Sequence, residues 1–137
     1  LEDLKVYKVT ESKELLASYL ECHPLVSACH GGIEGSYTIT EEKRNAFASK
    51  FIAHMELERA GIEDIMTWNE AGKTCEIWTN EECLNLIKEW NTISNALVKH
   101  QHTLELSIKA CRTKKSILQI DLSYSDADPR NKEEETE

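Results

Sequence analysis

The amino-acid sequence predicts a mostly helical α+β fold with two main amphipathic helices, a β-hairpin and short terminal strands. Apolar residues recur every three or four positions over residues 41–60 and 80–112, which is the spacing of one helix face. A glycine-bearing turn separates two short β-favouring runs within residues 65–78, and this is typical of a hairpin. Short alternations of apolar and polar residues at 4–10 and 120–124 favour strands.

The N-terminal part predicts a strand followed by a helix. The run LKVYKVT, residues 4–10, alternates as a strand does. Thr10 or Ser12 is then placed to cap a helix that ends near Pro24, because proline disfavours helix at the residue before it. The apolar residues of this predicted helix are Leu15, Leu16, Tyr19 and Leu20. Three glycines within residues 30–36 predict a loop with room for positive φ.

The first main helix is expected over residues 41–60. Thr40 followed by two glutamates is a helix start, and Gly61 is a natural residue after a helix end. His54 and Glu58 lie four residues apart and predict a solvated pair on the helix surface. The apolar positions that define its buried face are Phe47, Phe51 and Met55.

The hairpin at residues 65–78 is expected to pack on the helices. Gly72 lies in its turn, where positive φ is needed. A two-stranded hairpin is barely stable alone in water. We therefore expect Trp68, Trp78 and Trp90 to form the core where the hairpin meets the long helix.

The second main helix is expected over residues 80–112. Thr79 and Glu82 have the spacing of a capping box directly before an apolar run. The apolar stripe of this helix is interrupted at His100 and Gln101, so we expect a bend there or a different partner for the second half. The residues predicted to face a protein partner are Leu97, His100, Gln101, Leu104 and Ile108.

The C-terminal part predicts a short capped helix, a closing strand and a tail. Thr113 is a second cap, and IDLSY at residues 120–124 favours a strand. Residues 125–137 are acidic and almost free of apolar side chains, which predicts a disordered tail. We expect one globular domain over residues 1–124, with residues 1–39 as a separate N-terminal subregion in an alternative division.

Charge and composition exclude several classes of protein. A formal net charge of −9 argues against binding to a phosphate backbone, which needs clustered Lys and Arg. No apolar stretch of about 18 residues is present, so no membrane-spanning helix is expected. The odd count of five cysteines, without a CxxC pair, predicts reduced thiols, several of them buried.

Two Cys-His pairs, Cys22-His23 and Cys29-His30, are the candidates for chemistry. Zinc prefers thiolate and imidazole ligands, but adjacent side chains point in different directions on a regular element. The sequence therefore favours an ordinary helix end over a metal site. Motifs of catalytic or phosphate-binding sites are missing from the sequence. We expect no enzymatic activity and no cofactor, while a metal- or thiol-dependent protein stays an alternative.

Residues 40–124 carry a resemblance to a known family. A tryptophan before a short strand, a Thr-capped long helix, a second Thr cap and a final Ile-Asp pair follow in order. This pattern resembles a phage and prophage domain of unknown function that is found in tail-fibre, tail-fibre-assembly and other virion-associated proteins. The positions that carry the pattern here are Trp68, Thr79, Ile108, Cys111, Thr113, Ile120 and Asp121.

The resemblance implies a non-enzymatic structural or assembly module of a phage virion or tail. Its expected partners are other phage or virion proteins, or a second copy of the chain, and neither nucleic acid nor a membrane. Its expected location is the virion, or the bacterial host cytoplasm during assembly. A small acidic phage inhibitor of a host enzyme or defence protein stays an alternative, because small size and acidity fit it as well.

Overall fold

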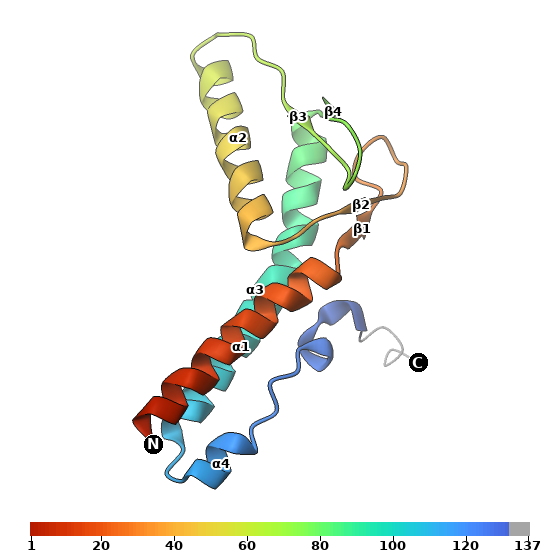
Figure 1. The fold of residues 1–137 in the computed structure, drawn as a ribbon. Helices are drawn as coiled ribbons and strands as arrows, with labels where there is room; N and C mark the ends of the chain where they lie inside the picture. Colours follow the sequence, from red (N-terminus) through yellow and green to blue (C-terminus); the bar gives the residue numbers. More distant parts are fainter. Residues whose placement is uncertain (132–137) are drawn as a thin grey trace. The chain divides into compact units, whose positions relative to one another are not determined.

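The computed structural model describes residues 1–131 of the chain. Within them it confirms the predicted mostly helical α+β class, with three long helices and two small antiparallel hairpins (Figure 1). The elements in chain order are α1 (Glu2–Cys22), β1 (Leu25–Ser27), β2 (Gly35–Tyr37), α2 (Glu41–Arg59), β3 (Thr67–Trp68), β4 (Glu76–Ile77), α3 (Asn80–Ala110), α4 (Lys114–Leu118), η1 (Ser125–Ala127) and η2 (Pro129–Asn131).

The chain divides into two compact units. The central unit is Leu20–Trp90, and the terminal unit joins Leu1–Tyr19 with the residues from Asn91 onward. Each unit buries its own set of apolar side chains. Residues 1–39 are divided between the two units and form no subregion of their own. The single domain predicted over residues 1–124 stays a prediction.

Aromatic side chains form the core of the central unit. The Phe47 ring on α2 meets the Trp68 ring edge-on at 4.9 Å between centroids, and it lies 5.9 Å from the Trp90 ring. All three residues are buried. Aromatic pairs at these distances add to the stabilisation from buried area. The predicted packing of the hairpin against the helices is therefore confirmed.

Helix α2 begins and ends where the sequence predicts. Thr40 Oγ1 accepts a hydrogen bond from the backbone N–H three residues on, at 3.3 Å. Gly61 closes the helix at φ 78°, a conformation that glycine adopts without strain. The buried face departs from the prediction at one point, because Met55 is exposed while His54 is buried.

The central unit holds two hairpins, of which the sequence predicts one. In the predicted hairpin Thr67 pairs with Ile77, and the strands are only two residues long. Gly72 lies in its connection at φ 78°. In the other hairpin, β1 and β2 are antiparallel and Leu25 pairs with Tyr37. Three-residue strands are too short to give a periodic pattern, so the sequence carries no signal for this second hairpin.

Helix α3 confirms the predicted long helix and its capping box. The Glu82 N–H donates to Thr79 Oγ1 at 3.1 Å, and the Thr79 N–H donates to Glu82 Oε1 at 2.9 Å. The helix continues without a break through His100 and Gln101. The polar pair therefore lies within the helix and does not end it.

In the terminal unit, the second half of α3 buries the stripe that the sequence predicts to be exposed. Leu97 and Ile108 have no exposed surface, and Leu104 is also buried. Gln101 is buried too, and its Nε2 donates to Ser12 Oγ of α1 at 3.2 Å. The expectation of a free stripe for a partner is wrong, because residues of the same chain cover it.

Helix α1 replaces the strand predicted at residues 4–10. Val6 and Tyr7, which belong to the predicted alternation, are exposed. Thr10 and Ser12, predicted as caps, lie inside the helix, and the Ser12 hydroxyl donates to the carbonyl three residues back at 2.6 Å. A short alternation is a weak strand signal where a longer helix is available. The more covered positions follow helical spacing at Lys5, Val9, Ser12 and Leu16.

The strand predicted at residues 120–124 is also wrong. Helix α4 precedes it and begins as predicted, with the Thr113 side chain accepting from a backbone N–H. Leu122 and Tyr124 are buried while their neighbours are more exposed, so the alternation is real. The Tyr124 hydroxyl donates to the Ser12 carbonyl at 2.6 Å. Within residues 1–131, however, this segment pairs with no strand.

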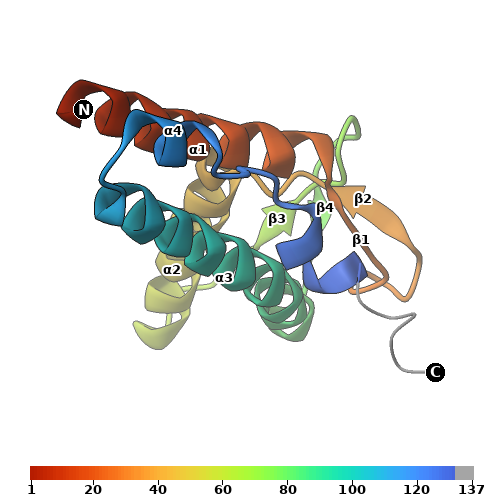
Figure 2. The same ribbon diagram turned by 90° about the horizontal axis from the view of Figure 1, so that it is seen from below.

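Residues 125–131, predicted as part of a disordered tail, form the two short turns η1 and η2 (blue in Figure 2). Asp128 between them is 1 % exposed. Its carboxylate accepts from the Tyr19 hydroxyl at 2.7 Å and pairs with Arg130 at 2.8 Å. The prediction missed this buried ion pair, because a run of polar residues gives no sign of it. The rest of the predicted tail, 132–137, lies outside the described residues.

Candidate functional site

One pocket of the central unit gathers side chains from three segments of the chain. Its volume is about 550 Å³, and ligand pockets commonly measure about 300–1,000 Å³. His30 comes from the β1–β2 loop and Tyr37 from β2. The residues contributed by the β3–β4 hairpin include Trp68, Glu70, Lys73, Glu76 and Trp78.

Aromatic rings form a continuous wall of the pocket. The His30 ring stacks on the Trp78 ring at 4.6 Å between centroids, with an interplanar angle of 3°. The Tyr37 ring meets the same indole edge-on at 5.5 Å. Burial, with a smaller contribution from nearby acidic groups, raises the pKa of Tyr37 to about 12. The Tyr37 phenol is therefore neutral at physiological pH.

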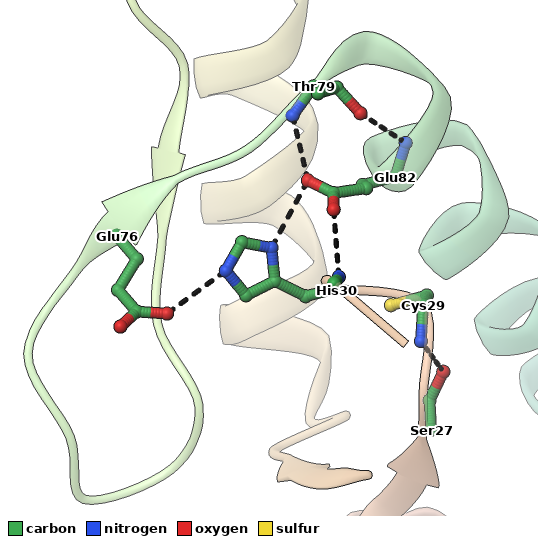
Figure 3. Close-up of polar contacts among 7 residues, drawn as sticks. Ser27, Cys29, His30, Glu76, Thr79 and Glu82 are labelled. Carbon is green, nitrogen blue, oxygen red and sulfur yellow. Dashed lines mark hydrogen bonds and ion pairs between the residues drawn. The ribbon is translucent and has the colours of Figure 1, made fainter. Parts of the chain in front are cut away.

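The Glu82 carboxylate joins the start of α3 to the β1–β2 loop. One oxygen accepts from the Thr79 N–H within the capping box (Figure 3), and the other accepts from the Gly31 N–H at 2.8 Å. Burial by itself would raise the pKa of Glu82. The hydrogen bonds from Thr79, Gly31 and His30 outweigh it and hold the pKa of this carboxyl below its usual value. Glu82 is therefore a fixed negative charge beside the pocket.

His30 lies between two carboxylates. Its Nδ1 is 3.1 Å from Glu82 Oε1, and its Nε2 is 3.0 Å from Glu76 Oε1 (Figure 3). A neutral imidazole carries one N–H, and an ionised carboxylate only accepts hydrogen bonds. Both contacts are therefore hydrogen bonds only when the ring is protonated. In that form His30 fixes Glu76 at the edge of the pocket.

Glu70 is held against strand β2. A side-chain carbon added at Gly35 would lie 2.7 Å from Glu70 Oε1, so a larger residue there would displace the carboxylate from its present position. The Ala71 N–H donates to the Ser36 carbonyl at 2.8 Å and fixes the same part of the hairpin connection. Lys73 pairs with Glu70 from the solvent side at 3.5 Å. The pocket thus carries a second positioned carboxylate.

The two predicted Cys-His pairs do not form a metal set. Cys22 and His23 are exposed, while Cys29 is half-buried and its N–H donates to Ser27 Oγ at 3.1 Å (Figure 3). Burial is the main cause that raises the pKa of the Cys29 thiol. Across residues 1–131, no three His, Cys, Asp or Glu side chains are grouped to hold a metal ion. All five cysteines are free, and only Cys83 is buried, fewer than the sequence predicts.

His54 is a second histidine of the central unit whose ring nitrogens are both engaged. Its Nδ1 contacts Asp64 Oδ2 at 2.6 Å, and its Nε2 contacts Asn80 Oδ1 at 3.0 Å. Glu58, the predicted partner, is 3.4 Å from Nε2. The pair is therefore present, but the prediction that it is solvated is wrong, because His54 is buried. These contacts tie the end of α2 to the start of α3.

The sequence analysis identified part of this site, but it assigned Glu82 to the capping box alone. Of the residues predicted to be structural, Trp68, Gly72 and Trp78 line the pocket. Glu82 is explained by the capping box in the sequence, which hides its second use as the acceptor for the β1–β2 loop. Tyr37, Glu70 and Glu76 were not anticipated. The predicted interface residues of α3 belong to the terminal unit and lie elsewhere, with His100 Nε2 donating to the Ser123 carbonyl at 3.0 Å.

Comparisons of the chain with protein-family models, with curated proteins and with solved structures gave no match. Among the helices within residues 1–131, none has the length and apolar character to cross a membrane.

Proposed function

We propose that this chain is a non-enzymatic module that acts through protein–protein contacts, with the pocket of the central unit at its binding surface. The resemblance of residues 40–124 supports a role of the module in a phage virion or tail, as a structural part or an assembly factor. Its partners are other phage or virion proteins or a second copy of the chain. Its location is the virion, or the bacterial host cytoplasm during assembly.

The observation that carries this proposal is the state of the polar groups around the pocket. A histidine that acts as a general base needs a ring nitrogen that is free to take a proton from a substrate. Both ring nitrogens of His30, which lines the pocket, are instead engaged by neighbouring side chains. The Cys29 thiol has a raised pKa, and a nucleophilic cysteine needs a lowered one. An aromatic-walled pocket with fixed charges fits recognition better than catalysis.

Exposed apolar side chains near the pocket support a contact surface. Ile33, which lines the pocket, is 76 % exposed, and Ile77 on β4 is 66 % exposed. Single exposed apolar residues are ordinary on a protein surface. Here they flank a pocket whose walls are aromatic, and aromatic residues are enriched at the centres of protein interfaces.

The proposal is tested by cross-linked capture of the full chain from phage-producing bacteria, followed by mass spectrometry and by light scattering of the purified protein. We expect a phage structural protein, or a defined oligomer, and we expect Ile33→Asp to weaken it. A matched control is Ile62→Asp, which replaces an exposed apolar residue outside the pocket. Capture of a host enzyme instead would favour the acidic-inhibitor alternative, and a strict monomer without partners would contradict the proposal.

A further inference from the structure

We infer that the pocket of the central unit receives one cationic side chain, a lysine or an arginine, from the partner protein. The inference depends on the proposed function, since it names what the binding surface recognises. It draws on three features of the pocket: its aromatic wall, its two positioned carboxylates, and the place of its own lysine.

The aromatic wall favours a cation over a neutral polar group. Tyr37, Trp68 and Trp78 line the pocket together; each is more than nine-tenths buried and presents only a small part of its ring to the pocket, and His30 stacks on the Trp78 ring. The faces of aromatic rings carry partial negative charge, so they attract ammonium and guanidinium groups and still accept the methylene stem of a long side chain. Lysine and arginine combine a stem and a charged head in this way. A pocket of about 550 Å³ has room for either.

The carboxylates supply the charge that a cation needs. The Glu76 side chain is 69 % exposed, and Oε1 alone is engaged, by His30. Glu70 Oε1 lies beside Gly35, and its other oxygen, Oε2, is 3.5 Å from Lys73 Nζ. A carboxylate has about four lone-pair positions. Both groups therefore keep acceptor capacity for an additional donor, and arginine can use two acceptors at once.

Lys73 marks the position of a cation in the pocket. Its Nζ lies 3.5 Å from Glu70 Oε2, while its side chain is 67 % exposed. An exposed pair of this kind contributes little to stability. Lys73 can therefore swing into solvent at low cost when a better-buried cation arrives. In the absence of a partner, Lys73 occupies the position beside Glu70 that the cationic side chain of the partner would take.

An anionic ligand fits the pocket less well. The basic side chains at the pocket are His30 and Lys73, and each already faces a carboxylate. An anion would have to take their donors from Glu76, Glu82 or Glu70. The net charge of −9 adds a long-range attraction for basic partners and repels acidic ones.

The direct test is an NMR titration of the full chain with N-acetyl-arginine methylamide, N-acetyl-lysine methylamide and the uncharged N-acetyl-citrulline methylamide. The three indole N–H signals are the readout, because Trp68 and Trp78 line the pocket and Trp90 does not. We expect the cationic amides to shift the signals of Trp68 and Trp78 but not that of Trp90. We expect the citrulline amide to bind about tenfold more weakly. Equal binding of citrulline and arginine amides, or no shift with either cation, would overturn the inference.

Variants separate the charge of the pocket from its shape. Glu70→Gln combined with Glu76→Gln removes both charges, and we expect it to abolish the preference for arginine over citrulline. Gly35→Ala keeps every charge but displaces the Glu70 carboxylate, and we expect a smaller loss. Glu63→Gln, an exposed glutamate outside the pocket, is the matched control. A double variant that still prefers arginine would overturn the inference.

Capture of the protein partner by the wild type and by the double variant distinguishes failure of this inference from failure of the proposed function. If the wild type and the Glu70/Glu76 double variant capture the same partner equally well, protein binding stands and the cation-binding pocket is wrong. If the wild type captures the partner and the double variant loses it, the inference is supported. If the wild type has no partner and does not self-associate, the proposed function is wrong, whereas the amide titration still decides the chemistry of the pocket.

Discussion

The two units of this protein differ in how some of their polar side chains are placed. In the terminal unit Ser12, Gln101 and Asp128 are buried, and each is hydrogen-bonded to residues of that unit. In the central unit Glu70 and Glu76 stand at the wall of a pocket with part of their acceptor capacity unused. Buried polar groups need partners from within the protein, whereas polar groups at a pocket are available for contacts with another molecule. We therefore expect recognition in the central unit rather than in the terminal unit.

The largest effect that would sharpen this comparison is expected from Ile108→Ala in the terminal unit. Ile108 has no exposed surface, so its truncation leaves a cavity and should lower the free energy of unfolding by about 2–5 kcal/mol. Leu106→Ala, two residues away on the same helix at a side chain 69 % exposed, should change it by less than about 0.5 kcal/mol. Urea unfolding followed by circular dichroism measures both. Similar small effects for the two variants would break the assignment of this stripe to the core.

The next largest effect is expected from Asp128→Asn. The change keeps the shape of the side chain but removes the charge that pairs with Arg130, and it should cost about 1–3 kcal/mol. Burial alone would raise the pKa of Asp128, but Arg130 and the Tyr19 hydroxyl hold the pKa lower than usual. Its stabilisation is therefore present above the pKa of an unfolded aspartate and is lost as the pH falls through the folded value.

The dependence of the unfolding free energy on acid pH is the second test of the Asp128→Asn variant. Wild type should lose stability on acidification more steeply than Asp128→Asn, as measured by urea unfolding at several pH values. Asp126→Asn removes an exposed carboxylate two residues away and should behave as wild type does. Equal acid dependence of the Asp128 variant and wild type would show that the buried pair contributes nothing.

A smaller effect is expected in the central unit from Glu82→Gln. The variant weakens acceptance from the Thr79 and Gly31 N–H groups, and loss of a capping interaction costs about 0.5–2 kcal/mol. Glu81→Gln is the control, since it removes an exposed charge from the same helix turn. Thermal unfolding compares their stabilities, and hydrogen exchange of Gly31 follows the loop. If the loop amide is equally protected in both variants, Glu82 does not hold the loop.

The smallest effect is a dependence of the central unit on pH near neutrality. The hydrogen bond to Asp64 raises the pKa of His54, although burial opposes it. The stabilisation is complete below the pKa of an unfolded histidine, about 6.5, and is lost as the pH rises through the folded value. Wild type should therefore be less stable at about pH 8 than at about pH 6. His54→Gln should flatten this dependence, and His102→Gln, at an exposed position, should leave it unchanged.

Local capping chemistry made the helix ends predictable. Thr40 with Gly61, Thr79 with Glu82, and Thr113 each mark a boundary that the structure has. These signals involve residues a few positions apart, so the helix boundary depends little on the rest of the chain. The hairpin at Gly72 is predictable for the same reason.

Signals that depend on distant residues were not predictable. The alternation at 120–124 describes burial correctly, but a strand also needs a neighbouring backbone, which the sequence does not specify. The apolar stripe of α3 was predicted well, whereas its exposure depends on α1 and the C-terminal segment covering it. The pocket combines residues as distant as His30 and Trp78. The residues of this region that stand out in the sequence are His30, Trp68, Gly72, Trp78 and the capping glutamate.

The shared carboxylate of Glu82 makes two local equilibria depend on each other. Its oxygens hold both the first turn of α3 and the β1–β2 loop. Opening of the β1–β2 loop therefore removes contacts that stabilise the Glu82 side chain at the start of α3. Fraying of the first turn of α3 in turn removes the acceptor for the loop. A molecule that occupies the pocket and orders the loop should slow amide exchange in the first turn of α3, although it touches none of those amides. The beginning of this helix would then report on occupancy at a distance through thermodynamic linkage alone.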